Sequence, residues 1–299
     1  MDNPRLCGAT PFVSEWGMGN RNYTPERKMH NMKYKLIAAD MDGTLVNDKS
    51  ELTERTKAAI VKAVDAGMIF VVATGRAFSN VQIVNDLFDK DMPFIVLNGA
   101  AAYMGKSEKL LFERLLDFEL AKEAFDIGQK KDMAQIVWAN PRLWGNRECD
   151  KTLQYANFYK SLKMSIVTDL TAIKDEVRGV SKLLWIDDPA KIKELSLEMR
   201  AHFGGRLQCF SSMSHFLEFI SNDAGKGAAL AEIGRLLGIE KSEMIAIGDG
   251  QNDIGMLEYA GFGVAVDNAI DEVKEVCDYI TLSNNNDGVA DVIEKYVLD

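Results

Sequence analysis

Short hydrophobic runs alternate with amphipathic segments along the chain from Lys35 onward. The runs are almost entirely apolar, which is typical of strands buried on both faces of a sheet. The first amphipathic segment predicts a helix that begins after Thr53, a good N-cap residue, and ends before Gly67. This β-α-β-α-β order predicts a parallel sheet with helices on both faces. The predicted strands cover residues 36–39, 68–73 and 94–97, and a second helix covers residues 81–88.

The C-terminal part of the chain repeats the same alternation. Gly238 is suited to close one of its helices, and Asp287 is a good N-cap candidate for the last one. We predict strands over residues 216–220, 244–247, 263–266 and 279–282, and helices over residues 226–237, 254–259 and 289–297.

The middle of the chain mixes strands and helices in another pattern and contains Trp138, Trp144 and Trp185, three of the four tryptophans. Strands are predicted over 134–138, 182–186 and 207–210, and helices over 119–129 and 190–202. We therefore predict an α/β fold, a doubly wound parallel-sheet core interrupted by an inserted α+β cap domain. The expected core covers residues 32–117 and 219–299, and the expected cap covers residues 118–218.

Residues 1–31 lack a periodic apolar pattern and hold three of the six prolines. They also lack the apolar region of a signal peptide. We expect an extension that is disordered or foreign to the native protein.

Composition narrows the classes of function. The 299 residues carry 45 acidic and 35 basic side chains, a formal charge of −10, which argues against nucleic-acid and anionic-membrane partners but allows a local anion site. Three histidines cannot build a His-rich metal site, and no apolar run is long enough to span a membrane. The four cysteines are far apart, which predicts a reduced, cytoplasmic protein.

The strongest chemical signal is the segment Asp40-Met41-Asp42-Gly43-Thr44-Leu45, directly after the first predicted strand. Ligands of open α/β sheets bind beyond the carboxyl ends of the strands. Two carboxylates in a glycine-containing turn can share a hard cation, with Asp42 contributing its backbone carbonyl. The alternative is an Asx-turn that caps the next element.

Three more polar segments follow predicted strands or open a helix. Thr74-Gly75-Arg76 offers a hydroxyl and backbone N–H groups to a phosphate, or forms a plain turn. Lys226 begins a helix, where it favours an anion or is simply solvated. The segment 248–253 adds Asp249, Asn252 and Asp253, as ligands or as turn residues. We expect these segments to meet at one edge of the sheet.

These motifs make the chain resemble the haloacid dehalogenase superfamily of phosphatases, within it the Cof-like branch with a large α/β cap. The DxDGT, Thr, Lys and GDxxND motifs of that family occur here in the family's order, and the resemblance runs from Lys33 to the C-terminus. Residues 98–100, 264–269 and 287–290 also look like segments that recur in this branch.

A phosphoryl transfer needs a nucleophile, groups that neutralise the charge of the phosphate, and a general acid and base. A carboxylate can form an aspartyl-phosphate, and the resemblance implies this role for Asp40, with Asp42 as acid and base. The expected catalytic residues are Asp40, Asp42, Thr74 and Lys226. The expected phosphate-binding residues are Met41, Gly43, Gly75, Arg76, Asn98 and Asn252. The expected Mg²⁺ ligands are Asp40, Asp42 and Asp249, with Asp253 in support.

The sequence thus predicts a Mg²⁺-dependent phosphatase for a small phosphomonoester, either a sugar phosphate or a cofactor-like or nucleotide-like phosphate. A phosphomutase would use the same aspartate pair, and a phosphate-ester-binding protein without turnover is a further alternative. An aspartate-phosphorylated receiver domain is a weaker one, because receivers are much shorter and lack the insertion. The sequence does not predict the oligomeric state.

Overall fold

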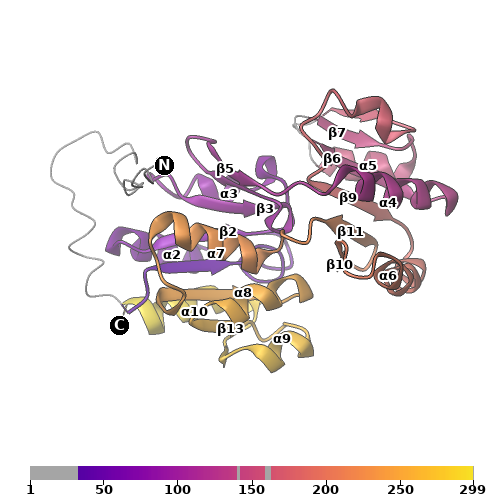
Figure 1. Ribbon diagram of the computed structural model, residues 1–299. Coiled ribbons are helices and arrows are strands. Elements are labelled where there is room, and N and C mark those ends of the chain that lie inside the picture. The colour runs from indigo at the N-terminus through magenta and orange to yellow at the C-terminus, as the bar shows by residue number, and fades with distance from the viewer. Residues whose placement is uncertain (1–32, 140–141, 159–162, 299) are drawn as a thin grey trace, which may run out of the picture.

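The computed structural model describes residues 33–139, 142–158 and 163–298, so the expected extension lies outside the described residues. The chain forms two sheets, a large one of eight strands and a small one of six. The small sheet lies beside the large one, at the upper right of Figure 1. In the described ranges, no helix has the length and apolarity needed to cross a membrane.

The large sheet is parallel except at one edge. Its strands are β1 Leu36–Ala39, β2 Ile69–Ala73, β3 Pro93–Val96, β4 Ala101–Met104, β5 Leu110–Glu113, β12 Met244–Gly248, β13 Phe262–Ala265 and β14 Tyr279–Ile280. Their order is β14-β13-β12-β1-β2-β3-β4-β5. The strands from β14 to β3 run parallel, and β4 and β5 extend the sheet as an antiparallel hairpin. All four residues of β1 are buried, which confirms the expectation from its apolar run.

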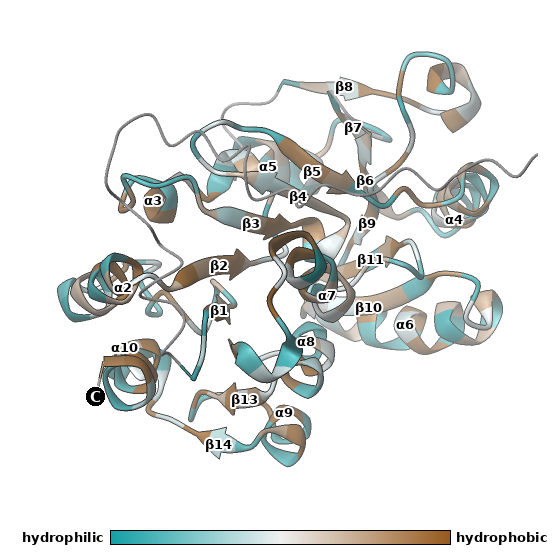
Figure 2. Cartoon of the chain, turned by 60° about the vertical axis from the view of Figure 1, so that its left-hand side comes forward, coloured by the Kyte–Doolittle hydropathy of each residue, from teal (hydrophilic) through white to brown (hydrophobic). Residues whose placement is uncertain are grey.

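Helices cover both faces of the large sheet. They are α2 Glu54–Ala66, α3 Gln82–Asn85, α7 Lys226–Leu237, α8 Ile254–Tyr259, α9 Asp271–Val276 and α10 Gly288–Ile293. Figure 2 shows α2 and α10 on one side of this sheet and α7 and α8 on the other, while β2 is hydrophobic along most of its length. The doubly wound prediction is therefore confirmed.

Three helix-end predictions are confirmed and two details are wrong. The Thr53 hydroxyl accepts a hydrogen bond from the Thr56 N–H, and Gly67 and Gly238 end their helices with positive φ. The helix predicted over 81–88 is only the short α3, preceded by a 3₁₀ turn at Phe78–Asn80. Asp287 precedes α10 but makes no side-chain cap, because its carboxylate instead accepts hydrogen bonds from hydroxyls at the start of α2.

The small sheet is mostly antiparallel. Its strands are β6 Ala134–Ala139, β7 Arg142–Gly145, β8 Met164–Ile166, β9 Lys182–Ile186, β10 Gln208–Met213 and β11 Phe216–Ile220, in the order β10-β11-β9-β6-β7-β8. Its helices are α4 Phe118–Lys130, α5 Asp150–Phe158 and α6 Pro189–Phe203. β11 pairs with β9 and β10, so the boundary expected after residue 218 falls inside a strand of this sheet.

Seven single turns complete the described secondary structure. They are the 3₁₀ turns Phe78–Asn80, Leu97–Gly99, Leu170–Ile173, Lys241–Glu243, Gln251–Asp253 and Asn284–Asn286, and a terminal π-helical turn at Glu294–Leu298.

The two faces of the small sheet pack differently. On one face Trp185 and Phe219 pack with Phe203 of α6 in a separate hydrophobic core. On the other face Trp138 packs with the hydrophobic core of the large sheet, and its indole N–H donates to the Tyr155 hydroxyl at 2.9 Å. This second face is the one that approaches the large sheet.

Candidate active site

The loops that follow β1, β2, β3 and β12 are joined by backbone hydrogen bonds at the carboxyl edge of the large sheet. The N–H of Asp40 donates to the carbonyl of Ile247 at 2.9 Å, and the N–H of Asn98 donates to the carbonyl of Thr74 at 3.0 Å. Because neighbouring parallel strands end at the same edge, the polar segments that follow them converge. The sequence prediction that these segments meet is confirmed by their positions.

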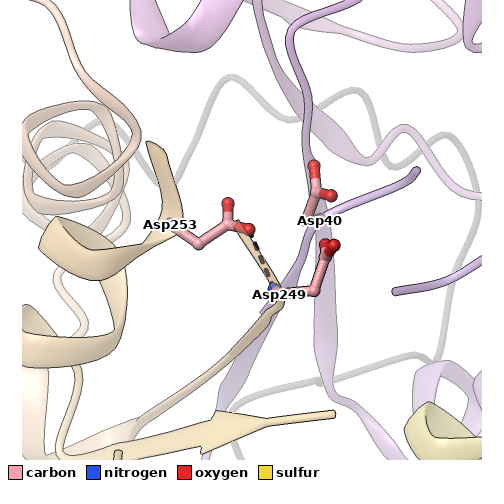
Figure 3. A group of neighbouring side chains, drawn as sticks. All are labelled: Asp40, Asp249 and Asp253. Atoms are coloured by element: carbon pink, nitrogen blue, oxygen red, sulfur yellow. Dashed lines mark hydrogen bonds between the residues drawn. The ribbon is translucent and has the colours of Figure 1, made fainter. Parts of the chain in front are cut away.

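Three carboxylates from this edge point toward one another (Figure 3). Asp40 follows β1, and Asp249 and Asp253 follow β12; one oxygen from each lies within 4.8 Å of the others. Burial, together with the neighbouring carboxylates, raises the pKa of Asp40 and of Asp249 above the usual range. Such a set of oxygen donors fits a small divalent cation, whose charge would oppose this shift.

Lys226, the first residue of α7, lies beside the carboxylates and is itself buried. Its ammonium donates to Asp40 Oδ1 at 2.5 Å and to Asp253 Oδ1 at 2.6 Å. Burial alone would lower the pKa of Lys226, but the charges of Asp253 and Asp40 outweigh it and raise that pKa. The lysine therefore enters the site as a cation.

The two carboxylates after β12 have different partners. Both oxygens of Asp253 are engaged within the chain, since Oδ1 accepts from Lys226 and Oδ2 accepts from the N–H groups of Asp249 and Gly250, each at 3.0 Å. Asp249 Oδ1 accepts a hydrogen bond from the Thr44 hydroxyl at 2.9 Å. Asp253 thus shapes the loop, while Asp249 is better placed to bind a cation.

The turn after β1 depends on Gly43, whose φ of +79° lies in the region that favours glycine. A Cβ atom at this position would lie 2.5 Å from Asp249 Oδ2. The Gly43 carbonyl also accepts a hydrogen bond from Asn268 Nδ2 at 2.7 Å. Thr44 and Asn268 therefore support the site, although neither was among the residues predicted from the sequence.

Asp42 lies outside the group of three carboxylates. Its side chain forms a two-point ion pair with Arg76, with distances of 2.5 and 2.8 Å, and is partly exposed. Sequence reasoning expected Arg76 to bind phosphate, whereas here its guanidinium holds Asp42. Carboxylate and guanidinium form a fork-to-fork contact that sets the orientation of both groups.

A second set of polar groups follows β2, β3 and β12. Thr74 is buried, and its hydroxyl oxygen accepts from the N–H of Arg76 at 3.1 Å. Asn98 is buried in the left-handed region with φ of +57°, and its Oδ1 accepts from Asn252 Nδ2 at 2.9 Å. The side chain of Met41 is buried in the hydrophobic core, so only its backbone can serve the site.

Comparisons with known proteins find similar sequences and similar structures over most of the chain. A profile of the haloacid dehalogenase-like hydrolases matches residues 37–293. The 5-amino-6-(5-phospho-D-ribitylamino)uracil phosphatases YwtE and YcsE of Bacillus subtilis are 32% and 30% identical, over 87% and 88% of this chain and 97% and 96% of their own. The crystal structure of a haloacid dehalogenase-like hydrolase from Bacteroides thetaiotaomicron has a TM-score of 0.76 at 30% identity, covering 88% of this chain and 99% of that one. The matched range contains every residue of the candidate site.

Proposed function

The chain belongs to the haloacid dehalogenase-like hydrolases, as a Cof-like phosphatase, and we propose that it hydrolyses small phosphomonoesters with Mg²⁺ through an aspartyl-phosphate. The main support for the proposal is that Asp40 lies close to Asp249 and Asp253 at the carboxyl edge of a parallel sheet. Lys226 donates a hydrogen bond to Asp40 at the same place. A nucleophile, a cation site and an ammonium are thereby within reach of one phosphoryl group.

In the proposed first step, a carboxylate oxygen of Asp40 attacks the phosphorus of the ester. The new P–O bond forms as the bond to the leaving alkoxide breaks, and Asp42 gives that alkoxide its proton. In the second step, water attacks the phosphorus of the aspartyl-phosphate while Asp42 takes a proton from it. Inorganic phosphate leaves and the Asp40 carboxylate is restored.

The acid–base role of Asp42 requires its side chain to move. In this structure both carboxylate oxygens of Asp42 accept from the guanidinium of Arg76, so Asp42 must leave that contact to reach the leaving group. The Asp42 side chain is partly exposed, which gives it room to turn.

The carboxylates of Asp40 and Asp249, with the Asp42 carbonyl, would hold Mg²⁺, and Asp253 would support the loop. When bound, Mg²⁺ neutralises negative charge on the phosphoryl oxygens. Thr74 and Asn252 would donate hydrogen bonds to those oxygens, with backbone N–H groups near Met41, Gly43 and Gly75. Lys226 would add an ammonium that is already buried and oriented.

The small sheet and its helices would act as the cap over this site, with the large sheet and its helices as the core. A cap excludes water and selects the leaving group. The names of YwtE and YcsE specify a phosphorylated ribitylamino-uracil, which supports a small phosphate ester as the substrate class here. Widely spaced cysteines support a cytoplasmic location.

A panel of phosphorylated metabolites, assayed for free phosphate with Mg²⁺, tests the proposal. The panel should contain sugar phosphates, cofactor phosphates, nucleotides and a generic aryl phosphate. We expect phosphate release from at least one small ester, loss of release with EDTA and recovery with excess Mg²⁺. Transfer of phosphate within the substrate would indicate a mutase, and an absence of any turnover would contradict the proposal.

A further inference from the structure

Lys182 and Glu218 are two oppositely charged side chains buried where the small sheet meets the candidate active site. Lys182 begins β9 and Glu218 lies in β11, and their side chains are 1% and 4% exposed. The ammonium lies 3.2 Å from Glu218 Oε2 and donates to Oε1 at 3.3 Å. Burying both charges removes their favourable hydration, and the attraction between them often fails to compensate for that loss. The pair is therefore a weak source of folding stability.

Glu218 reaches across to the large sheet and orients two amides. Its Oε2 accepts from Asn98 Nδ2 at 2.7 Å, and Asn98 Oδ1 accepts from Asn252 Nδ2 at 2.9 Å. Because a carboxylate only accepts, Asn98 must turn its NH₂ toward Glu218 and its carbonyl toward Asn252. The second hydrogen on Asn252 Nδ2 is then available to a phosphoryl oxygen.

Lys182 acts on the neighbouring loop through one peptide group. Its ammonium donates to the Gly75 carbonyl at 3.2 Å. The C=O and N–H of a trans peptide point in opposite directions, so this contact turns the Arg76 N–H toward Thr74. That N–H donates to Thr74 Oγ1 at 3.1 Å. The hydroxyl, which accepts this bond, keeps its own hydrogen for another acceptor.

The two hydrogen-bond chains, one from Glu218 to Asn98 and one from Lys182 to Gly75, also pack against each other. A Cβ atom on Gly75 would lie 3.0 Å from Asn98 Oδ1 and 3.1 Å from Asn98 Nδ2. The loops after β2 and β3 thus have little room to move independently. A displacement of Glu218 or Lys182 would be passed to both loops at once.

We propose that Lys182 and Glu218 are positioning residues that aim the hydrogen-bond donors of Thr74 and Asn252 at the substrate phosphate. This inference rests on the proposed phosphatase function and extends it, since the small sheet then helps to build the phosphate site.

The charges of the two side chains also balance. Glu218 alone would repel a phosphate dianion, and Lys182 neutralises the charge of Glu218. Removing only Lys182 should therefore harm phosphate binding more than removing both side chains.

Three variants of the full chain test the inference: Glu218→Leu, Lys182→Met and the double variant. The dissociation constant of inorganic phosphate with Mg²⁺ is measured by calorimetry, together with KM, kcat and Tm. We expect the double variant to fold and to bind phosphate about tenfold more weakly, the effect of losing one charge-assisted hydrogen bond. Lys182→Met should bind phosphate more weakly still, a non-additive pattern that marks direct coupling.

The kinetic constants separate positioning from folding. A positioning defect raises KM with kcat nearly unchanged, because bonds that hold both substrate and transition state are weakened. A folding defect lowers kcat at constant KM, because fewer molecules are active. Either single variant leaves one buried charge unpaired, but the double variant leaves none. If a single variant fails to fold, the phosphate affinity and KM of the double variant therefore test the inference.

Asp187→Asn is the matched control, because Asp187 follows β9 directly and forms ion pairs with Lys151 and Lys191 away from the phosphate loops. It should leave phosphate affinity and KM unchanged. The inference is overturned if the double variant retains wild-type phosphate affinity and KM. Phosphate affinity can be measured without turnover. A protein that hydrolyses no ester would therefore contradict the proposed function, while the phosphate affinities of the variants would still test this inference.

Discussion

The ammonium of Lys226 donates to a carboxylate oxygen of Asp40 at 2.5 Å, with both side chains almost wholly buried. The lysine comes from the start of α7 and the aspartate from the end of β1, 186 residues apart. A buried cation beside the proposed nucleophile offsets part of the charge that two neighbouring carboxylates place there. The charges of Lys226 and Asp40 therefore interact directly before a substrate binds.

Replacing Lys226 with methionine should strongly destabilise the metal-free protein. Three neighbouring carboxylates would lose their internal cation, and breaking a buried pair typically costs about 3–5 kcal/mol. Urea unfolding without metal measures this loss, and Mg²⁺ should recover part of it. The control is Lys122→Met, which removes a partly exposed pair with Asp126 within one helix and should hardly change the unfolding curve. Equal curves for the two variants would contradict this role of Lys226.

Stabilisation by Mg²⁺ should increase with pH. Burial raises the folded-state pKa of Asp40 and of Asp249, so without metal these two carboxyls bind protons more tightly in the folded protein than in the unfolded chain. Their contribution to stability therefore falls as pH rises above the unfolded value near 3.8. Mg²⁺ needs both carboxylates ionised and competes with those protons. The Mg²⁺-induced rise in Tm should be larger at about pH 8 than at about pH 5. A rise that is equal at both pH values would refute this coupling.

Thr44→Val should weaken Mg²⁺ binding without removing a ligand. The Thr44 hydroxyl donates to Asp249 Oδ1, and losing such an orienting partner usually costs about 10–100-fold in metal affinity. Titration with Mg²⁺, followed by activity or by calorimetry, measures the change. Thr44→Ser keeps the hydroxyl and is the matched control. If the serine and valine variants bind Mg²⁺ equally well, the hydrogen bond has no part in the metal site.

Asp287 should stabilise the fold through α2 rather than through its own helix. Its Oδ1 accepts from the hydroxyls of Thr53 and Thr56 at the start of α2. Asp287→Ala leaves these hydroxyls without their acceptor and should cost about 1–3 kcal/mol in the free energy of unfolding. Asp287→Asn keeps an acceptor oxygen and should cost less. Chemical denaturation compares them, and an alanine variant as stable as the wild type would disprove the contact's importance.

Local signals in the sequence predicted much of the fold. The helix over 226–237 and its closing Gly238 were identified to the residue, because cap and periodicity signals are encoded locally. The hairpin of β4 and β5 was missed, since its strands are only four residues long and carry no clear alternation. The placement of β11 was also wrong, because its pattern does not say which sheet it joins.

The candidate site was predictable in its residues but less so in its contacts. Short motifs identified Asp40, Asp249 and Lys226, and parallel-sheet topology brought their loops together. The pairing of Asp42 with Arg76 and the reach of Glu218 to Asn98 were not predictable. These contacts span 34 and 120 residues, and the second joins the two sheets. Both depend on side-chain geometry that no local pattern encodes.

The proposed mechanism depends on an aspartyl-phosphate at Asp40, and this intermediate can be trapped. Wild-type protein and Asp40→Asn are mixed with a substrate ester and Mg²⁺, quenched rapidly in acid, digested and analysed by mass spectrometry. We expect a phosphorylated peptide containing Asp40 in the wild type, and neither a phosphorylated peptide nor phosphate release in a folded Asp40→Asn protein. Phosphate release by Asp40→Asn at the wild-type rate would contradict the role of Asp40 as nucleophile.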